Sequence, residues 1–133
     1  MTAKVTYLGN LRTEAEHLQS HTKIITDAPV DNHGLGESFS PTDAVATALA
    51  TCMLTIMGIK AEAMQISIKG ATAEVTKTMA SEPRRISKIE VKLTLAENLD
   101  QKDRKILQNA AKTCPVFYSL HPDIEKDIQF IYA

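Results

Sequence analysis

Residues 40–60 read SPTDAVATALATCMLTIMGIK, and this stretch decides the fold of the chain. Ser40 and Pro41 are residue types preferred at the N-cap and first helical position, and Asp43 adds negative charge where the helix dipole favours it. No charged residue occurs from 44 to 59. That run is shorter than the roughly 20 apolar residues that a bilayer crossing needs. The stretch therefore predicts a long buried helix, and we expect no membrane association.

The composition is that of one ordinary domain. With 133 residues the chain has a common domain size, so we expect a single domain over residues 1–133. A formal net charge of −1, without runs of like charge, argues against nucleic acid as a partner. The N-terminus enters an alternating pattern at Lys4 without a signal segment, which predicts a cytoplasmic protein. In a reducing compartment, a bond between the two cysteines would be transient or catalytic.

Polar and apolar side chains alternate on both sides of the helix, which is the period of β-strands. Gly9 and Asn10 are typical of a hairpin turn between the first two strands. We expect strands over 4–8, 11–18, 22–26, 89–95 and 128–132, and around the pairs Ile66/Ile68 and Ala73/Val75. The pattern predicts an α+β fold with antiparallel sheets around the long buried central helix. Because one small sheet covers only one face of that helix, a second subunit would have to cover the rest.

A second helix begins after Asp100, and Pro115 begins a short third one. The sulfur of Cys114 then lies at a helix N-terminus, where unpaired N–H groups favour a thiolate. Local physics thus makes Cys114 the better nucleophile, and the alternative is a cap or core filler. Cys52, on the long helix, is either a small core side chain or a reactive thiol that needs a nearby cation.

Two separated motifs together resemble the OsmC/Ohr family of hydroperoxide reductases. They are the helix start 39–43, leading to Ala50-Thr51-Cys52, and the later segment 111–116, which reads AKTCPV. The order of elements is also similar over nearly the whole chain. The resemblance implies an OsmC/Ohr-like fold and an intertwined homodimer with the long helices enclosed between the sheets of both subunits.

The resemblance also implies an activity and its residues. Cys52 would be the thiolate that attacks an organic hydroperoxide and becomes a sulfenic acid, and Cys114 would condense with it to a disulfide. A dithiol, of the lipoyl type in the Ohr branch, would reduce that disulfide, and no cofactor is needed. Arg12 corresponds to the arginine that the family places against the reactive sulfur. Its alternatives are an exposed strand charge at this position or a role for Arg84 or Arg85, which otherwise belong to a solvated turn.

The sequence departs from the family pattern after the proline of the helix start. Many members have a glutamate there that holds the arginine, whereas this chain has Thr42. Asp43 is one residue further, about 100° around the helix, so it points elsewhere. Glu37 in the preceding loop is a candidate substitute. We therefore take Glu37, Thr42 and Asp43 as the candidate substrate-binding residues.

The departure leaves two readings of the function open. The first is a thiol-dependent peroxidase. The second is a non-catalytic dimer that binds a small apolar or electrophilic molecule and uses its cysteines as sensors or not at all. A purely structural dimer would leave the two sulfurs apart. We expect no metal site, since the four histidines are scattered.

Overall fold

The computed structural model describes residues 1–133. The chain forms two compact units, Met1–Val45 and Ala46–Ala133. The single domain expected from the sequence stays a prediction. The elements are β1 (Ala3–Gly9), β2 (Arg12–His17), β3 (Lys23–Asp27), a short 3-10 helix (Val30–Asn32), α1 (Pro41–Ala63), β4 (Thr72–Ala80), β5 (Arg85–Leu95), α2 (Gln101–Ala111), α3 (Pro115–Ser119) and β6 (Glu125–Tyr132).

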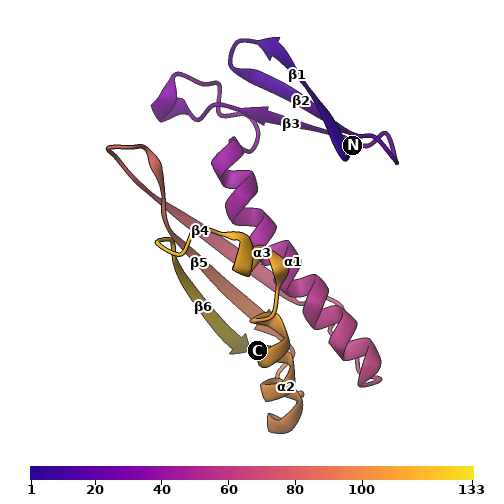
Figure 1. Ribbon diagram of the computed structural model, residues 1–133. Helices are drawn as coiled ribbons and strands as arrows, with labels where there is room; N and C mark the ends of the chain where they lie inside the picture. The colour runs from indigo at the N-terminus through magenta and orange to yellow at the C-terminus, as the bar shows by residue number, and fades with distance from the viewer. The chain divides into compact units, whose positions relative to one another are not determined.

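The first unit contains an antiparallel sheet in the order β1-β2-β3, drawn in indigo in Figure 1. Its first turn lies one residue later than predicted. Asn10 and Leu11 have φ of 54° and 60°, which suits the mirror-image turns that match the twist of a hairpin. Strand β2 therefore resumes at Arg12. In β2 and β3, Arg12 pairs directly with Asp27.

The loop after β3 folds back tightly on its own beginning. The N–H of Gly36 donates to the carbonyl of Ala28 at 3.2 Å, and that of Gly34 donates to Pro29 at 2.9 Å. A Cβ on Gly34 would lie 1.7 Å from the Ala28 carbonyl oxygen, so only glycine fits this approach. The loop then returns to β3, because the N–H of Asp27 donates to the Phe39 carbonyl at 3.0 Å.

Helix α1 begins where the sequence predicts. The Ser40 hydroxyl accepts from the Asp43 N–H, and the Asp43 carboxylate accepts from the Ser40 N–H, both at 3.0 Å. This reciprocal pair satisfies two donors that a helix start leaves free. The helix is long and apolar enough to cross a membrane by length and composition alone. Leu49, Met53 and Met57 are nonetheless fully buried in the protein core, as in the central helix of a folded domain.

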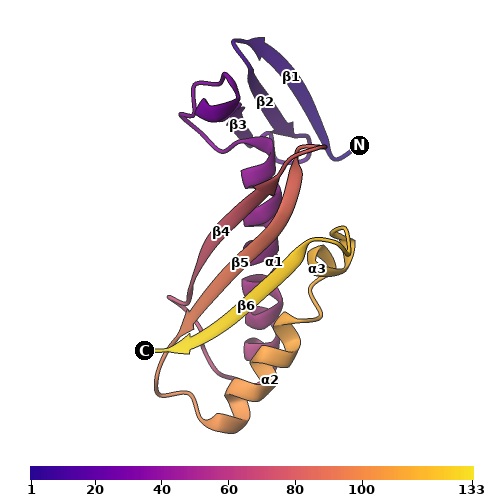
Figure 2. The same ribbon diagram turned by 90° about the vertical axis from the view of Figure 1, so that its left-hand side faces the viewer.

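The second unit is built on a sheet in the order β4-β5-β6, with α1, α2 and α3 on one face of it (Figures 1 and 2). Strands β4 and β5 are antiparallel, but β6 runs parallel to β5 from Glu125 to Tyr132. The expectation of purely antiparallel sheets is wrong for this pair. A parallel neighbour needs a long crossover, and α2 with α3 supplies it.

The side chains of β5 alternate as predicted. Ile89, Val91, Leu93 and Leu95 are buried on the helix-covered face, whereas Lys92 on the other face is exposed. The two sheets and the helices together confirm the α+β class expected from the sequence.

The strand expected around Ile66 and Ile68 does not form. The two isoleucines lie in an irregular connection between α1 and β4 and pack against the core. Residues with positive φ flank this connection, Gln65 at 59° and Gly70 at 91°, so the chain turns at both ends. Period-two spacing over three residues is too short to distinguish a strand from such a segment.

Candidate functional site

The second unit brings the two cysteines together. Cys52 lies on α1, and Cys114 is the N-cap of α3. Their side chains lie within hydrogen-bonding reach of each other, and both thiols are free. Cys114 is fully buried, whereas Cys52 is half-buried and packs against the edge of the core. The structure therefore contains an adjacent pair of thiols that differ in access to solvent.

The electrostatics of Cys114 reverse the expectation from local sequence. Burial, followed by the side-chain hydrogen bond with Cys52, raises the pKa of Cys114 above its ordinary value. The N–H of Phe117 donates to the Cys114 sulfur at 3.4 Å and opposes this pKa rise, but its effect is smaller. Burial thus favours the thiol form of Cys114 over the thiolate expected at a helix start. The pKa rise caused by burial exceeds the pKa decrease caused by the backbone N–H groups at the start of the helix.

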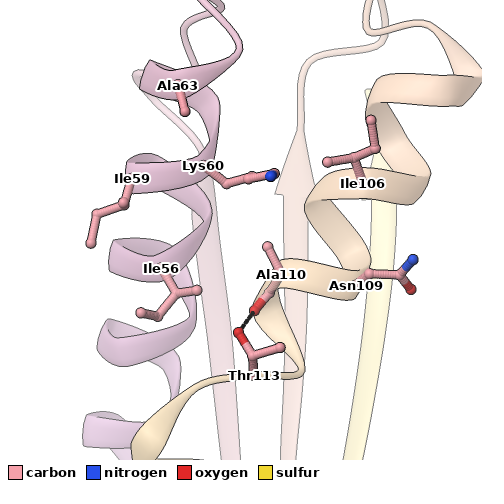
Figure 3. A pocket seen from close by; sticks show the side chains of 8 residues that line it. All are labelled: Ile56, Ile59, Lys60, Ala63, Ile106, Asn109, Ala110 and Thr113. Carbon is pink, nitrogen blue, oxygen red and sulfur yellow. Dashed lines mark hydrogen bonds between the residues drawn. The ribbon is translucent and has the colours of Figure 1, made fainter.

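An apolar groove runs between α1 and α2 in the second unit (Figure 3). Its volume is about 510 Å³, within the range of small-molecule sites. The α1 side contributes Ile56, Ile59, Lys60 and Ala63. The α2 side contributes Ile106, Asn109, Ala110 and Thr113, which directly precedes Cys114. Sequence reasoning missed this groove, because the packing of α2 beside α1 could not be read from spacing.

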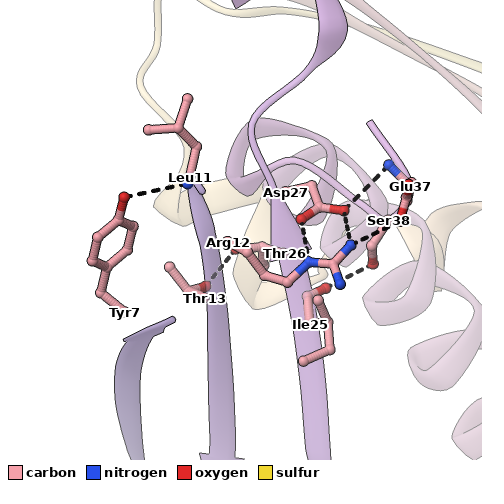
Figure 4. Close-up of polar contacts among 9 residues, drawn as sticks. All are labelled: Tyr7, Leu11, Arg12, Thr13, Ile25, Thr26, Asp27, Glu37 and Ser38. Carbon is pink, nitrogen blue, oxygen red and sulfur yellow. Dashed lines mark hydrogen bonds and ion pairs between the residues drawn. The ribbon is translucent and has the colours of Figure 1, made fainter. Parts of the chain in front are cut away.

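The first unit contains a charged cluster around Arg12 (Figure 4). Arg12 binds Asp27 with two hydrogen bonds, from Nε at 2.7 Å and from Nη2 at 2.9 Å. Nη2 also donates to a carboxylate oxygen of Glu37 at 3.0 Å. The backbone N–H of Glu37 completes the cluster by donating to Asp27 at 3.2 Å. Glu37, the candidate substitute for the missing family glutamate, is thus in contact with Arg12.

These contacts fix the charges and the orientation of the cluster. The hydrogen bond from Arg12 is the main cause that lowers the pKa of Asp27, and the two carboxylates raise the pKa of Arg12. The Asp27 side chain is 1% exposed and that of Glu37 is 67% exposed, so the cluster has an inner and an outer carboxylate. Bidentate binding leaves Arg12 Nη1 without a hydrogen bond inside the chain.

Sequence reasoning did not identify Asp27 as a partner of Arg12. The signal that could have found it is the register of β2 and β3, which places Asp27 directly opposite Arg12. Opposite charges in directly paired positions stabilise a sheet.

The remaining candidates lie at the helix start and in the β4–β5 turn. The Asp43 carboxylate is part of the reciprocal cap with Ser40, and the Thr42 hydroxyl lies 3.3 Å from the Ser40 hydroxyl. Their roles in substrate binding stay predictions. Arg85 donates to the carbonyls of Ser81 and Pro83 at 3.0 and 2.9 Å, so it closes its own turn.

A comparison with protein families gives one match, to a model described as OsmC-like protein, over residues 34–129. No curated protein matches the chain. The matched range contains both cysteines and Glu37, whereas Arg12 lies before it.

Solved structures of similar fold come from several bacteria. One from Psychrobacter arcticus, provisionally described as an osmotic stress induced and detoxification response protein, is 59% identical over 98% of this chain and 95% of its own, with a TM-score of 0.94. An organic hydroperoxide resistance protein OsmC from Legionella pneumophila is 16% identical over 97% and 94%, with a TM-score of 0.76. A Vibrio cholerae protein, provisionally described as an organic hydroperoxide resistance protein, has captopril bound in one of its active sites; it is 13% identical over 98% and 91%, with a TM-score of 0.74.

Proposed function

Because this chain belongs to the OsmC-like family, we propose that it is a cysteine-dependent peroxidase that reduces organic hydroperoxides. One observation carries the proposal, namely that a half-buried thiol, Cys52, lies beside a fully buried thiol, Cys114, which burial keeps protonated. A peroxidase of this kind needs one accessible sulfur to meet the oxidant and a second sulfur within reach to receive the product. The hydroperoxide resistance proteins of the same fold are consistent with this chemistry.

In the first step, the Cys52 thiolate attacks the outer oxygen of the hydroperoxide. The O–O bond breaks, an S–O bond forms, and the alkoxide leaves as an alcohol after it takes up a proton. The sulfur is oxidised to a sulfenic acid and the peroxide is reduced by two electrons. The Arg12 guanidinium is proposed to stabilise the thiolate, since a cation lowers the pKa of a nearby thiol.

In the second step, the Cys114 sulfur attacks the sulfenic acid. An S–S bond forms, the S–O bond breaks, and the sulfenic hydroxyl leaves as water after it takes up the Cys114 proton. A dithiol reductant of the lipoyl type then restores both thiols by thiol–disulfide exchange and is itself oxidised to a disulfide. The sum is hydroperoxide plus dithiol giving alcohol, water and a cyclic disulfide, so no metal or organic cofactor is required.

The proposal includes a homodimer. In the second unit, Thr51, Thr55 and Ile59 of α1 are exposed, although the helix is uncharged around them. The Thr51 hydroxyl donates to the Ala48 carbonyl at 3.0 Å and that of Thr55 to the Thr51 carbonyl at 2.8 Å. With their hydroxyls satisfied inside the helix, the threonines offer methyl groups to a second subunit. Sedimentation at several concentrations would test this part separately.

Peroxide consumption by three proteins tests the enzyme assignment. The wild type should reduce cumene hydroperoxide with dihydrolipoamide over many turnovers. Cys52→Ser should be inactive. Cys114→Ser should consume about one equivalent and then stall, because its sulfenic acid lacks the second sulfur. Full activity in Cys52→Ser, or no activity in the wild type with any organic hydroperoxide, would overturn the assignment and favour a binding or sensing role.

A further inference from the structure

The helix-covered face of β6 holds a lysine among apolar side chains. Lys126 pairs with Ile89 of β5, which is fully buried beneath the helices, so both side chains point to the same face of the sheet. Further along β6, Ile128, Phe130 and Tyr132 follow at the strand period and pack against the core. Lys126 itself is half-buried. Because a buried ammonium is costly unless its charge is bound, this position requires partners for Nζ.

The partners of Lys126 lie in the segment that follows Cys114. Its Nζ donates to the carbonyl oxygen of Ile124 at 3.1 Å and to that of His121 at 3.4 Å. The same Nζ lies 5.3 Å from the centre of the Phe117 ring, which is within the range of a cation–π interaction. One ammonium therefore holds together α3 and the connection that leads from α3 into β6 (Figure 2).

Phe117 connects Lys126 with the sulfur of Cys114. Its backbone N–H donates to Cys114 Sγ at 3.4 Å, while its ring contacts the ammonium. Helix α3 has only five residues, too few to be stable by itself. Its orientation, and with it the position of the sulfur beside Cys52, therefore depends on contacts with the rest of the second unit.

From these contacts we propose that Lys126 is a positioning residue that keeps the Cys114 sulfur in place to attack the sulfenic acid of Cys52. The inference rests on the proposed function and concerns its second step, in which the S–S bond forms as the S–O bond breaks and water leaves. Without the ammonium, α3 is held less firmly and this step slows. The sulfenic acid then meets a second hydroperoxide, which oxidises it to a sulfinic acid and is itself reduced to an alcohol.

Rapid mixing of the reduced protein with cumene hydroperoxide, quenched for mass spectrometry, separates the two steps. Lys126→Met should form the sulfenic acid at the wild-type rate, but its disulfide should form about tenfold more slowly, since a small misplacement of reacting groups costs at least that much. Sulfinic acid should accumulate. Lys126→Arg should retain most of the rate, because a guanidinium also donates to carbonyls and stacks on a ring. Lys92→Met, on the exposed face of the same sheet, is the matched control and should behave as the wild type.

The Phe117 ring provides a test that a general loss of stability does not meet. Phe117→Leu removes the ring and keeps the backbone N–H, so it should slow disulfide formation in the same way. The double variant of Lys126→Met and Phe117→Leu should be no slower than the slower single variant, because both changes break the same contact. Fully additive effects on the rate constant would overturn the inference.

A disulfide equilibrium separates this inference from the peroxidase assignment, because it needs no hydroperoxide. In mixtures of reduced and oxidised dithiothreitol, the disulfide between Cys52 and Cys114 should be about tenfold easier to reduce in Lys126→Met than in the wild type. If the wild type reduces cumene hydroperoxide, an unchanged rate of disulfide formation in Lys126→Met overturns the inference and leaves the peroxidase standing. If it reduces no hydroperoxide, the proposed function fails, and an unchanged equilibrium shows that Lys126 does not position Cys114 either.

Discussion

The thiol pair in the second unit and the arginine cluster in the first unit differ in how burial affects the ionisation of their side chains. At Cys114, burial is the main influence on the thiol pKa and keeps the sulfur neutral. Around Arg12, hydrogen bonds outweigh burial, so Asp27 stays ionised with only 1% of its side chain exposed. The comparison shows that hydrogen bonds decide the ionisation state in the arginine cluster, whereas burial decides it at Cys114.

Substitution of Arg12 should have the largest of the effects expected here, and it should appear in the peroxidase kinetics. Arg12→Met should lower kcat/KM for cumene hydroperoxide by roughly a hundredfold, because a preorganised cation at a developing charge is worth that much in catalysis. Arg12→Lys should recover only part of this loss, since an ammonium cannot bind a carboxylate with two parallel bonds. Steady-state kinetics measure both values.

The pH dependence of iodoacetamide alkylation provides the control for Arg12. In a Cys114→Ser background, where Cys52 is the remaining thiol, Arg12→Met should move the alkylation profile to higher pH. An unchanged profile together with unchanged kinetics would show that the charged cluster serves the first unit alone.

The two carboxylates around Arg12 should differ, because one is buried and the other is exposed. Asp27→Asn should lower the Tm clearly, since it removes the charged partner from a buried bidentate pair, whereas Glu37→Gln should leave the Tm almost unchanged. Circular dichroism melts measure both. Equal effects would mean that the inner and outer carboxylates are energetically alike.

The same pair predicts a pH dependence for the Asp27 effect. The folded pKa of Asp27 lies below its ordinary value of 3.8, so its contribution to stability is complete above that pH and is lost as the pH falls through the folded pKa. The Tm difference between wild type and Asp27→Asn should thus be constant from about pH 5 to pH 8 and shrink below about pH 4. A difference that grows in acid would contradict the assigned direction.

The smallest effect is expected on the free energy of unfolding at alkaline pH, and it arises from Cys114. The folded pKa of Cys114 lies above its ordinary value of 9.0, so its contribution is complete below that pH and is lost as the pH rises through the folded pKa. The free energy of unfolding of the wild type should fall relative to Cys114→Ser only above about pH 9. Urea titrations under reducing conditions measure the difference, and a loss that begins near neutral pH would contradict it.

The parts that were predictable from sequence are those with strong local signals. Ser40, Pro41 and Asp43 determine the start of α1, and β5 shows its alternation over a full strand. The spacing in residues could not bring Cys52 next to Cys114, and that juxtaposition came only from resemblance to a family. The thiolate expected at Cys114 is opposed by burial, because solvent access is a property of the folded chain.

The parts that were missed depend on pairing between distant segments. Asp27 binds Arg12 through strand register, and the parallel pairing of β6 depends on the crossover through α2 and α3. In the sequence, Lys60 only marks the end of the uncharged stretch. The groove that it lines forms only where α2 packs beside α1. Each of these features needed a three-dimensional neighbour that no local pattern contains.

The tight return of the loop at Gly34 has a practical consequence for anyone who wishes to follow the arginine cluster by spectroscopy. A side chain at this position would overlap the Ala28 carbonyl, so a cysteine introduced there for labelling would reshape the segment that carries Glu37. Its neighbour Leu35 is 49% exposed and offers a place for a fluorophore on the same loop. A dye attached at Leu35 would report on changes around Glu37 while leaving the close backbone approach intact.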